Sequence, residues 1–172
     1  MILQRLFRPR PAAERTLYEA IVAAARHPVF YAEWGIPDTL DGRFDMIVLH
    51  VFVVLERLKV EAPRFRQRLV DELFADMDRS LREMGVGDLS VGKKVRVMAE
   101  VFYGRVSAYE TALNGEPSGL AAALERNLFP DGAPGGSVEK LAAHVRALRV
   151  KLGATAPELL AAGQVTFPEP KP

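Results

Sequence analysis

The sequence predicts an all-α protein folded as a single compact bundle of about six or seven helices. Apolar residues recur at steps of three or four along most of the chain, as they do on one face of a helix, and strand-like alternation is almost absent. Turn residues such as Pro28, Pro63 and Asn114-Gly115 separate these periodic segments. The chain has 172 residues, of which 49% are hydrophobic and 26% charged, which fits one domain over residues 1–172 with a substantial core.

Turn and capping residues place the helices along the chain. Pro28 ends the first, and the apolar run at residues 46–55 makes the second apolar nearly all round, as expected of a central helix. Gly85 is expected to end the third in a left-handed conformation, and Ser90 to cap the fourth. The predicted helices are residues 13–26, 42–59, 64–84, 90–113, 118–128, 137–152 and a last helix from residue 155.

Three further boundary predictions concern the C-terminal half and the segments between helices. Ser137 is expected to cap its helix, and Thr155 with Glu158 to form a capping box at the last one. The segment at residues 27–42 is expected to be a loop. Residues 164–172 are expected to form an extended, weakly held tail.

The composition argues against several classes of function. The formal net charge of +1 argues against a general nucleic-acid binder, so no nucleic acid is expected as a partner. The absence of cysteine removes disulfides, thiol nucleophiles and thiolate metal sites, and fits a cytoplasmic protein. As a helix, residues 46–55 would cover about 15 Å, about half of a bilayer core. We therefore expect a cytoplasmic protein that is soluble, or peripheral at the inner face of the cell membrane.

Residues 87–94 read G-D-L-S-V-G-K-K, one residue short of the loop that cradles nucleotide phosphates. That loop follows a strand and needs Ser or Thr where this chain has Lys94, whereas these glycines follow a predicted helix, so nucleotide binding is not expected. No catalytic, cofactor-binding or metal-binding residue is predicted elsewhere. The serines lack an elbow motif, and His50, with no second histidine one turn away, is expected to form a hydrogen bond inside the bundle.

The same glycines lie between two helices of complementary charge. The helix before them is acidic and the helix after them is basic, which predicts a helical hairpin with a charged turn, the hairpin knuckle (residues 78–94). If Ser90 caps the second helix, Lys93 and Lys94 lie in its first turn, where they oppose the helix dipole. Two interpretations stay open: the charges pair with one another, or the knuckle binds an anionic or polypeptide partner.

Residues 77–98, MDRSLREMGVGDLSVGKKVRVM, closely resemble the signature of the ubiquinol–cytochrome c chaperone family. The resemblance extends, in order, to residues 35–58 and 101–113 and covers about half of the chain. It implies an all-α assembly chaperone domain without enzymatic activity, here expected as a bacterial member. Family members are understood to bind newly made cytochrome b, a hydrophobic multi-helix client, and to promote assembly of the cytochrome bc1 complex.

The resemblance also implies partners and site residues. The expected partners are cytochrome b and, as in the mitochondrial forms, a small co-chaperone or the ribosome. The positions carried over from the family motif, with roles in binding client or partner, are Asp78, Arg79, Arg82, Glu83, Gly85, Gly87, Asp88 and Lys93, and Lys94 is added from the same knuckle.

Three aromatic residues are further candidates for contact with a client. Tyr31 and Trp34, in the loop after the first helix, either pin that loop to the bundle or present aromatic anchors of the kind enriched in binding hot spots. Tyr103 lies beside Gly104 and Ala108, whose small side chains are expected to admit a neighbouring helix. Tyr103 therefore either joins the core or faces a client.

The structure of the N-terminus and the function of the basic residues each allow an alternative interpretation. Within residues 1–12, the first ten pair apolar side chains with arginines, which is typical either of a short helix on an anionic membrane surface or of a frayed terminus. The alternative function is an RNA- or ribosome-contacting accessory factor that uses Lys93, Lys94, Arg96 and Arg105.

Overall fold

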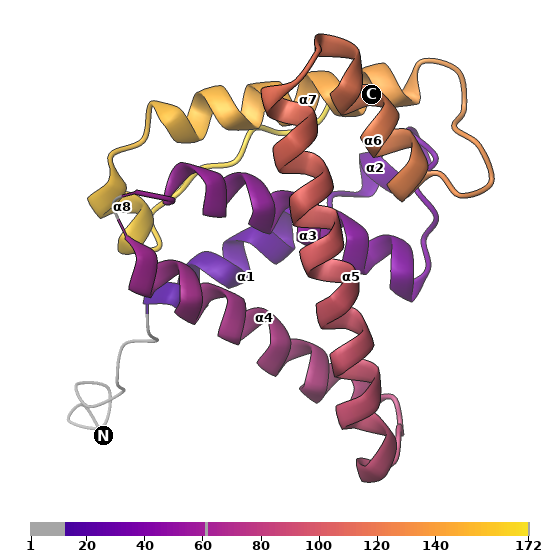
Figure 1. The fold of residues 1–172 in the computed structure, drawn as a ribbon, viewed down its shortest axis with the longest axis vertical. Coiled ribbons are helices and arrows are strands. Elements are labelled where there is room, and N and C mark those ends of the chain that lie inside the picture. The colour runs from indigo at the N-terminus through magenta and orange to yellow at the C-terminus, as the bar shows by residue number, and fades with distance from the viewer. Residues whose placement is uncertain (1–12, 61, 172) are drawn as a thin grey trace, which may run out of the picture.

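The structure is a computed structural model that describes residues 13–60 and 62–171; the predictions for residues 1–12 lie outside this part. The described residues form eight α-helices and no strand, which confirms the predicted all-α class. The helices, shown in Figure 1, are α1 (Ala13–Ala25), α2 (Pro28–Ala32), α3 (Leu40–Arg57), α4 (Pro63–Glu83), α5 (Asp88–Asn114), α6 (Pro117–Leu128), α7 (Ser137–Gly153) and α8 (Pro157–Ala161).

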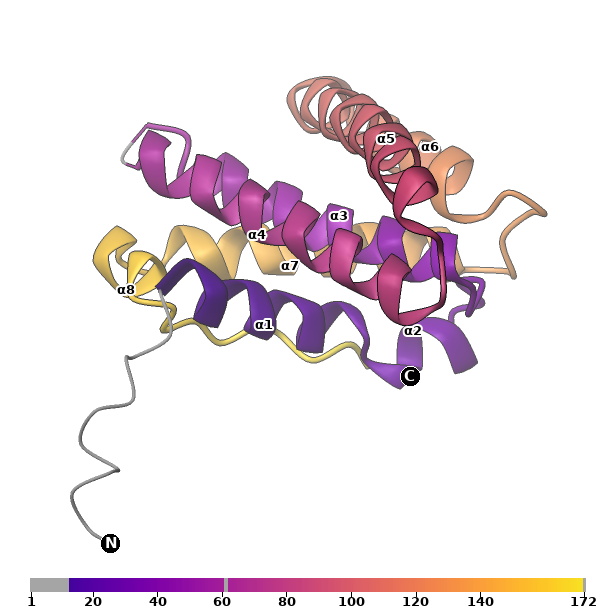
Figure 2. The same cartoon turned by 90° about the horizontal axis from the view of Figure 1, so that it is seen from below.

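The central helix of the bundle is α3. Every residue from Phe44 to Leu55 is buried, because α3 contacts α1, α5, α6 and α7. Figure 2 shows α1 and α5 on opposite sides of it. A helix covered in this way needs apolar residues on every face, which is the pattern that the sequence shows. The prediction of a central helix is confirmed.

Helices α4 and α5 form a helical hairpin, and its turn projects from the body of the molecule (Figure 1). Gly85 ends α4 with a φ of +83°, the left-handed conformation that glycine adopts at least cost. The helix α5 has 27 residues, but among them Val91, Phe102 and Tyr109 alone are buried. Most of the remaining residues in the first half of α5 are exposed, whereas its second half packs half-buried side chains against the bundle.

The start of α5 differs from the prediction. The helix begins at Asp88 with Gly87, in an extended conformation, as its N-cap residue, so Ser90 lies inside the first turn instead of capping it. The Asp88 carboxylate lies where the helix dipole favours an acidic group. Lys93 and Lys94 lie in the second turn, beyond the short range of the dipole. The expected conflict between these lysines and the dipole is therefore absent.

Two other predicted caps are wrong. Gly136, with a φ of +79°, occupies the N-cap position of α7, so Ser137 is the first residue of that helix and is buried. The last helix begins at Pro157, and Thr155 does not cap it. The Thr155 hydroxyl instead donates a hydrogen bond to the carbonyl of Lys151, at 2.9 Å, and so remains tied to the end of α7.

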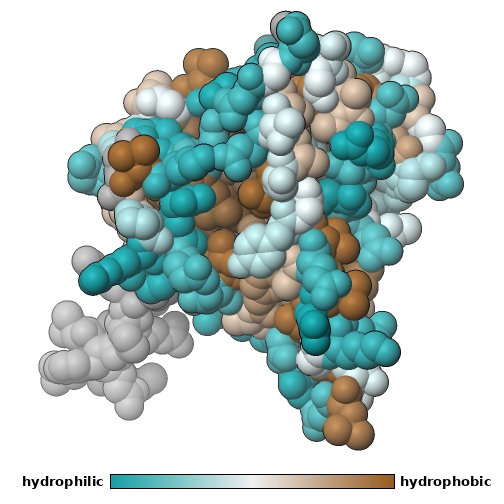
Figure 3. All heavy atoms as spheres, in the orientation of Figure 1, coloured by the Kyte–Doolittle hydropathy of each residue, from teal (hydrophilic) through white to brown (hydrophobic). Residues whose placement is uncertain are grey.

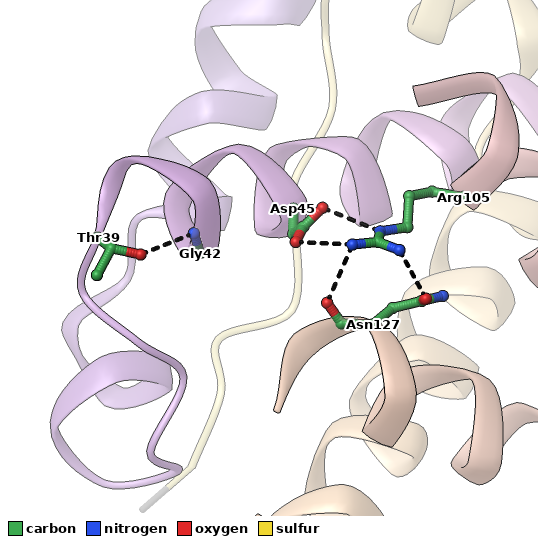
Figure 4. Close-up of polar contacts among 5 residues, drawn as sticks. All are labelled: Thr39, Gly42, Asp45, Arg105 and Asn127. Atoms are coloured by element: carbon green, nitrogen blue, oxygen red, sulfur yellow. Dashed lines mark hydrogen bonds and ion pairs between the residues drawn. The ribbon is translucent and has the colours of Figure 1, made fainter. Parts of the chain in front are cut away.

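The segment at residues 27–42 contains α2, a helix that the sequence analysis missed. The side chain of His27 accepts a hydrogen bond from the N–H of Val29, at 3.3 Å, and caps a helix too short for apolar periodicity to reveal. Helix α3 also starts earlier than predicted, because the Thr39 hydroxyl accepts a hydrogen bond from the N–H of Gly42, at 3.1 Å (Figure 4).

The C-terminal segment is extended but firmly anchored. Residues 164–171 run back along α1 toward α2 (Figure 2). The Phe167 ring lies against the His50 ring, with centroids 6.4 Å apart, and Trp34 Nε1 donates a hydrogen bond to the carbonyl of Lys171, at 3.2 Å. The expectation of a weakly held tail is wrong, because its middle and its end both contact the core.

Candidate protein-binding surface

A polar cluster fixes α5 against α3 and α6 (Figure 4). Arg105 donates hydrogen bonds to both carboxylate oxygens of Asp45, at 3.1 and 3.3 Å, and to the side-chain oxygen of Asn127, at 2.8 Å. Burial raises the pKa of Asp45, although the Arg105 guanidinium opposes the shift. The prediction that Arg105 adds to an exposed basic surface is wrong. Its charge is paired with Asp45 at the point where α5 crosses the bundle.

Beyond this cluster, apolar surface gathers in the recess between α4 and α5 (Figure 3). The two helices carry half-buried apolar side chains that pack against the edge of the core: Phe74 on α4, and Met98 and Val106 on α5. The exposed Tyr103 ring adds to this surface, whereas Val97, about 120° away around α5, is exposed on the other side of its open face. We call this surface, with its two bordering helices, the α4–α5 recess.

A run of aromatic rings leads from the core to the surface of α5. The Phe74 and Phe102 ring centroids are 5.6 Å apart, and those of Phe102 and Tyr103 are 5.1 Å apart, both in edge-to-face arrangement. Phe102 is buried, whereas Tyr103 is 57% exposed. Of the two interpretations of Tyr103, the core position is wrong, and its ring is available to a partner.

Gly104 lies on a side of α5 that no helix of the described residues approaches closely. A Cβ atom placed on Gly104 would meet nothing within 4 Å, so the expected close approach of a helix inside the fold is wrong. Because Gly104 has no side chain, the backbone of α5 is exposed next to Tyr103. Such small residues let a second helix approach closely in membrane proteins.

The charges of the hairpin knuckle pair largely with one another. Arg82 forms ion pairs with Asp78, at 2.6 Å, and with Asp88 across the turn, and Arg79 pairs with Asp76 at 2.7 Å. The hydrogen bond from Arg82 lowers the pKa of Asp78. These groups are exposed, so their pairing contributes little to the free energy of folding. For these residues the mutual-pairing interpretation holds.

Three charges of the knuckle have no such partner. Glu83, Lys93 and Lys94 are exposed, and none forms an ion pair with a residue that the structure describes. Gly85 is required by its positive φ, whereas Gly87 has a φ of −64° and room for a Cβ atom. Of the nine predicted knuckle residues, these three charges are the ones left available for contact with a partner.

The two loop aromatics serve the fold. Trp34 is 3% exposed and packs edge-to-face on the Phe30 ring, with centroids 5.2 Å apart. The prediction that Trp34 faces a client is therefore wrong. Tyr31 is half-buried, and its hydroxyl donates a hydrogen bond to the carbonyl of Ala25, at 2.9 Å, while burial raises its pKa to about 12. Both rings pin the segment around α2 to the bundle.

His50 forms the intrabundle hydrogen bond that the sequence predicts, but its second partner was missed. Its Nδ1 lies 2.8 Å from the carbonyl of Met46, which can only accept, so Nδ1 carries the proton. The His50 Nε2 then accepts from the Nε2–H of His144, 3.4 Å away. Burial lowers the pKa of both histidines to about 4. Across residues 13–60 and 62–171, no group of three metal-ligating residues is assembled.

Taken together, these features define an all-α domain with an open apolar helix surface. No helix in the described part of the chain is long and apolar enough to cross a membrane. The family model described as Ubiquinol-cytochrome C chaperone matches residues 32–167, and the chain belongs to this family.

Known relatives carry related names. The chain is 30% identical over 116 residues to "Ubiquinol-cytochrome-c reductase complex assembly factor 1" of Xenopus laevis, a match that covers 66% of this chain and 58% of that protein. It is 27% identical over 106 residues to "Protein CBP3, mitochondrial" of Saccharomyces cerevisiae, covering 58% of this chain and 32% of that protein. The chain thus matches only part of the length of these relatives.

A solved structure matches nearly the whole chain. The crystal structure of the Cbp3 homolog from Brucella abortus is 41% identical, with a TM-score of 0.80, and the match covers 98% of this chain and 97% of that one. The fold described above is therefore shared with an experimentally determined relative.

Proposed function

We propose that the chain promotes assembly of the ubiquinol–cytochrome c reductase (bc1) complex, as a non-enzymatic chaperone that binds newly made cytochrome b. The names of the relatives support the assembly role. The proposal that a client binds here rests on the exposure of α5. Only three of the 27 residues of this helix are buried, and apolar side chains lie along the α4–α5 recess.

The chemistry of the recess suits a helix of a membrane protein. Amphipathic or apolar helices bind in grooves lined by other helices, with apolar side chains as anchors. Phe74 on α4 and Val106 on α5 offer apolar contact, and Tyr103, about 60° from Val106 around α5, offers an aromatic anchor. The bare backbone at Gly104, on the open face of α5, permits close approach of a second helix there. Shielding apolar segments in this way needs binding and no covalent step.

The knuckle adds unpaired charge beside the recess. Glu83, Lys93 and Lys94 lie on the two helices that border it, and they can orient the protein toward its client or partner. Contacts made through exposed charges weaken as the salt concentration rises. The site of action consistent with such a client is the cytoplasm, at the inner face of the cell membrane.

The experiment is capture from detergent-solubilised membranes of the host with tagged full-length chain. We expect cytochrome b to be recovered with the wild type and to be lost with Tyr103→Asp. This side chain is 57% exposed, so the fold tolerates the change. The matched control is Val150→Asp on α7, where the side chain is 74% exposed and lies outside the recess.

Two results would count against the proposal. Equal recovery of cytochrome b with the recess variant and with the control would exclude the recess as the binding surface. Recovery of ribosomal components without cytochrome b would favour the accessory-factor alternative, for which Lys93 and Lys94 remain available although Arg105 does not.

A further inference from the structure

The C-terminal strap (residues 164–171) is hydrogen-bonded to the body only at its two ends. At its start the N–H of Gln164 donates a hydrogen bond to a carbonyl of α8, at 2.8 Å, and at its end the carbonyl of Lys171 accepts one from Trp34 Nε1, at 3.2 Å. Within the described chain, no hydrogen bond joins residues 165–170 to the helices. Two of these six residues are prolines, which have no N–H to donate. Between its ends the strap is therefore held by side-chain packing.

One side of the strap faces the body and the other faces solvent. Val165 and Phe167 are half-buried and pack against the core, and Pro170 is buried. Thr166 and Glu169 are exposed. Extended peptides that bind to a protein surface place some of their side chains in pockets in this way, and those side chains give specificity. The packing of the strap is therefore that of a bound peptide.

Aromatic rings line the surface that the strap covers. The Phe167 ring lies against that of His50, with centroids 6.4 Å apart. Trp34 packs on His144, with centroids 6.0 Å apart, and donates its hydrogen bond to the strap carbonyl next to the buried Pro170. Grooves lined by aromatic side chains bind proline-containing segments, whose restricted backbone loses little entropy on binding. We call this surface, lined by Trp34, His50 and His144, the strap groove.

The residues that line the strap groove are fixed by contacts that do not involve the strap. Trp34 packs edge-to-face on Phe30 of α2, with centroids 5.2 Å apart. The His50 Nδ1–H donates to the carbonyl of Met46 within α3, at 2.8 Å. The groove should therefore keep its shape when the strap leaves it, as a largely preformed binding site does.

Gly163 fixes the point from which the strap starts. Its φ is +72°, and a Cβ atom placed on it would lie 2.9 Å from the side chain of Thr16, so the chain leaves α8 in close contact with α1. A tail tethered this close has a high effective concentration at the groove, and a free peptide competes poorly with it. The groove is therefore filled in cis, and a ligand from another chain enters when the tail is weakened or displaced.

We propose that the strap groove is a binding site for an extended peptide with the pattern apolar–x–aromatic–Pro–x–Pro. Residues 165–170 fill it in cis, and a segment of another polypeptide with this pattern fills it in trans. The proposal rests on a tail that is held by side-chain packing and one indole N–H, over a groove that the helices form without it. Figure 2 shows the strap along α1, on the side of α3 opposite to α5, so the site is distinct from the α4–α5 recess. It does not depend on the identity of the client.

The test uses the full-length chain with a tail that cannot bind, Val165→Asp with Phe167→Asp. Trp34 is the one tryptophan of the chain, so its fluorescence reports on the strap groove. In this tail variant its emission should move to longer wavelength, because the indole becomes hydrated. Adding a synthetic peptide of residues 163–172 should reverse the shift. The same peptide with Phe167→Ala should bind at least about tenfold more weakly, because it loses the apolar contact of the ring.

Two controls make this result specific. Gln164→Asp with Thr166→Asp adds the same charge at exposed positions of the strap and should keep the wild-type emission. Far-ultraviolet circular dichroism should show the wild-type helical signal in the tail variant. If it does not, Phe167→Ala in the full-length chain is a smaller change that takes its place in the test.

Four results would overturn the proposal: wild-type emission from the folded tail variant, a shift that the peptide does not reverse, equal binding of the two peptides, or loss of the helical signal in both variants. Association of the wild-type chain with the tail variant, measured by size-exclusion chromatography, would support it and identify the tail of a second copy as a ligand in trans. The tail variant should capture cytochrome b as the wild type does, and Tyr103→Asp should keep the wild-type Trp34 emission. This proposal and the proposed function can therefore fail separately.

Discussion

The helices α3 and α5 both carry many apolar residues, but their surroundings differ. In α3 every residue from Phe44 to Leu55 is buried, whereas α5 buries three of 27 residues. Four helices cover α3, while the first half of α5 has α4 alone beside it in the hairpin. Apolar residues in a helix therefore mark either a core or a binding surface, and the neighbours of the helix decide which.

The largest effect is expected from truncation in α3. Phe52 is 2% exposed, and its ring packs on that of Tyr109 with centroids 5.6 Å apart. Phe52→Ala should lower the free energy of unfolding by about 3–5 kcal/mol, because it leaves a cavity. Val97→Ala on the open face of α5 should change it by less than about 0.5 kcal/mol. Urea denaturation measures both, and equal effects would show that the two helices are equally buried in solution.

The second effect is a loss of stability in acid. The pKa of both His50 and His144 is about 4 in the fold, against 6.5 for an ordinary histidine, because burial disfavours the charged rings. His27 adds to the shift of His144. Between these values the unfolded chain binds more protons, so the free energy of unfolding falls as pH drops below 6.5.

The loss for the two rings together should reach about 2–4 kcal/mol by about pH 5. Denaturation curves recorded across this range measure it. His144→Gln removes one titrating ring and should flatten the pH dependence by about half. Stability that is constant from neutral pH to about pH 5 would contradict the buried, neutral pair.

The third effect concerns the attachment of α5. Arg105→Ala should lower the free energy of unfolding by about 2–3 kcal/mol, because it leaves Asp45 charged and poorly solvated. Replacing both partners, with Arg105→Met and Asp45→Leu, should restore part of the loss, since neither charge is then stranded. A double variant less stable than Arg105→Ala would show that the cluster has a role beyond pairing.

The smallest effects separate the two glycines of the knuckle. Gly85→Ala should cost about 1 kcal/mol, because its φ of +83° strains any side chain. Gly87→Ala should change the free energy of unfolding by less than about 0.5 kcal/mol, since its φ is −64° and its Cβ position is open. Thermal midpoints of the two variants give the comparison, and equal costs would mean that the turn differs in solution.

The long helices were predictable from the sequence because each has many apolar repeats. The periodic stretches at residues 42–59 and 64–84 correspond to α3 and α4 within a few residues. The helix α2 was missed, because five residues hold little more than one turn of the pattern. The predicted N-caps at Ser90 and Ser137 were wrong, because a glycine earlier in the chain, Gly87 or Gly136, occupies the N-cap position instead.

The candidate surface was predictable only in part. The motif located the hairpin, but which of its charges pair depends on the rotation of α4 against α5, which periodicity does not give. Val97 and Tyr103 are exposed because no helix of the part of the chain that the structure describes covers that face of α5, and such coverage is a tertiary property. His50 and His144 lie 94 residues apart, and no local pattern links them.

The central claim is that the open face of α5 binds cytochrome b. The most direct measurement is photo-crosslinking from single positions of the full-length chain in host membranes, with the reactive group placed at Tyr103 or, as a control of comparable exposure, at Val150. We expect a cytochrome b adduct from position 103 and none from position 150. An adduct of equal yield from both positions, or none from position 103, would contradict it.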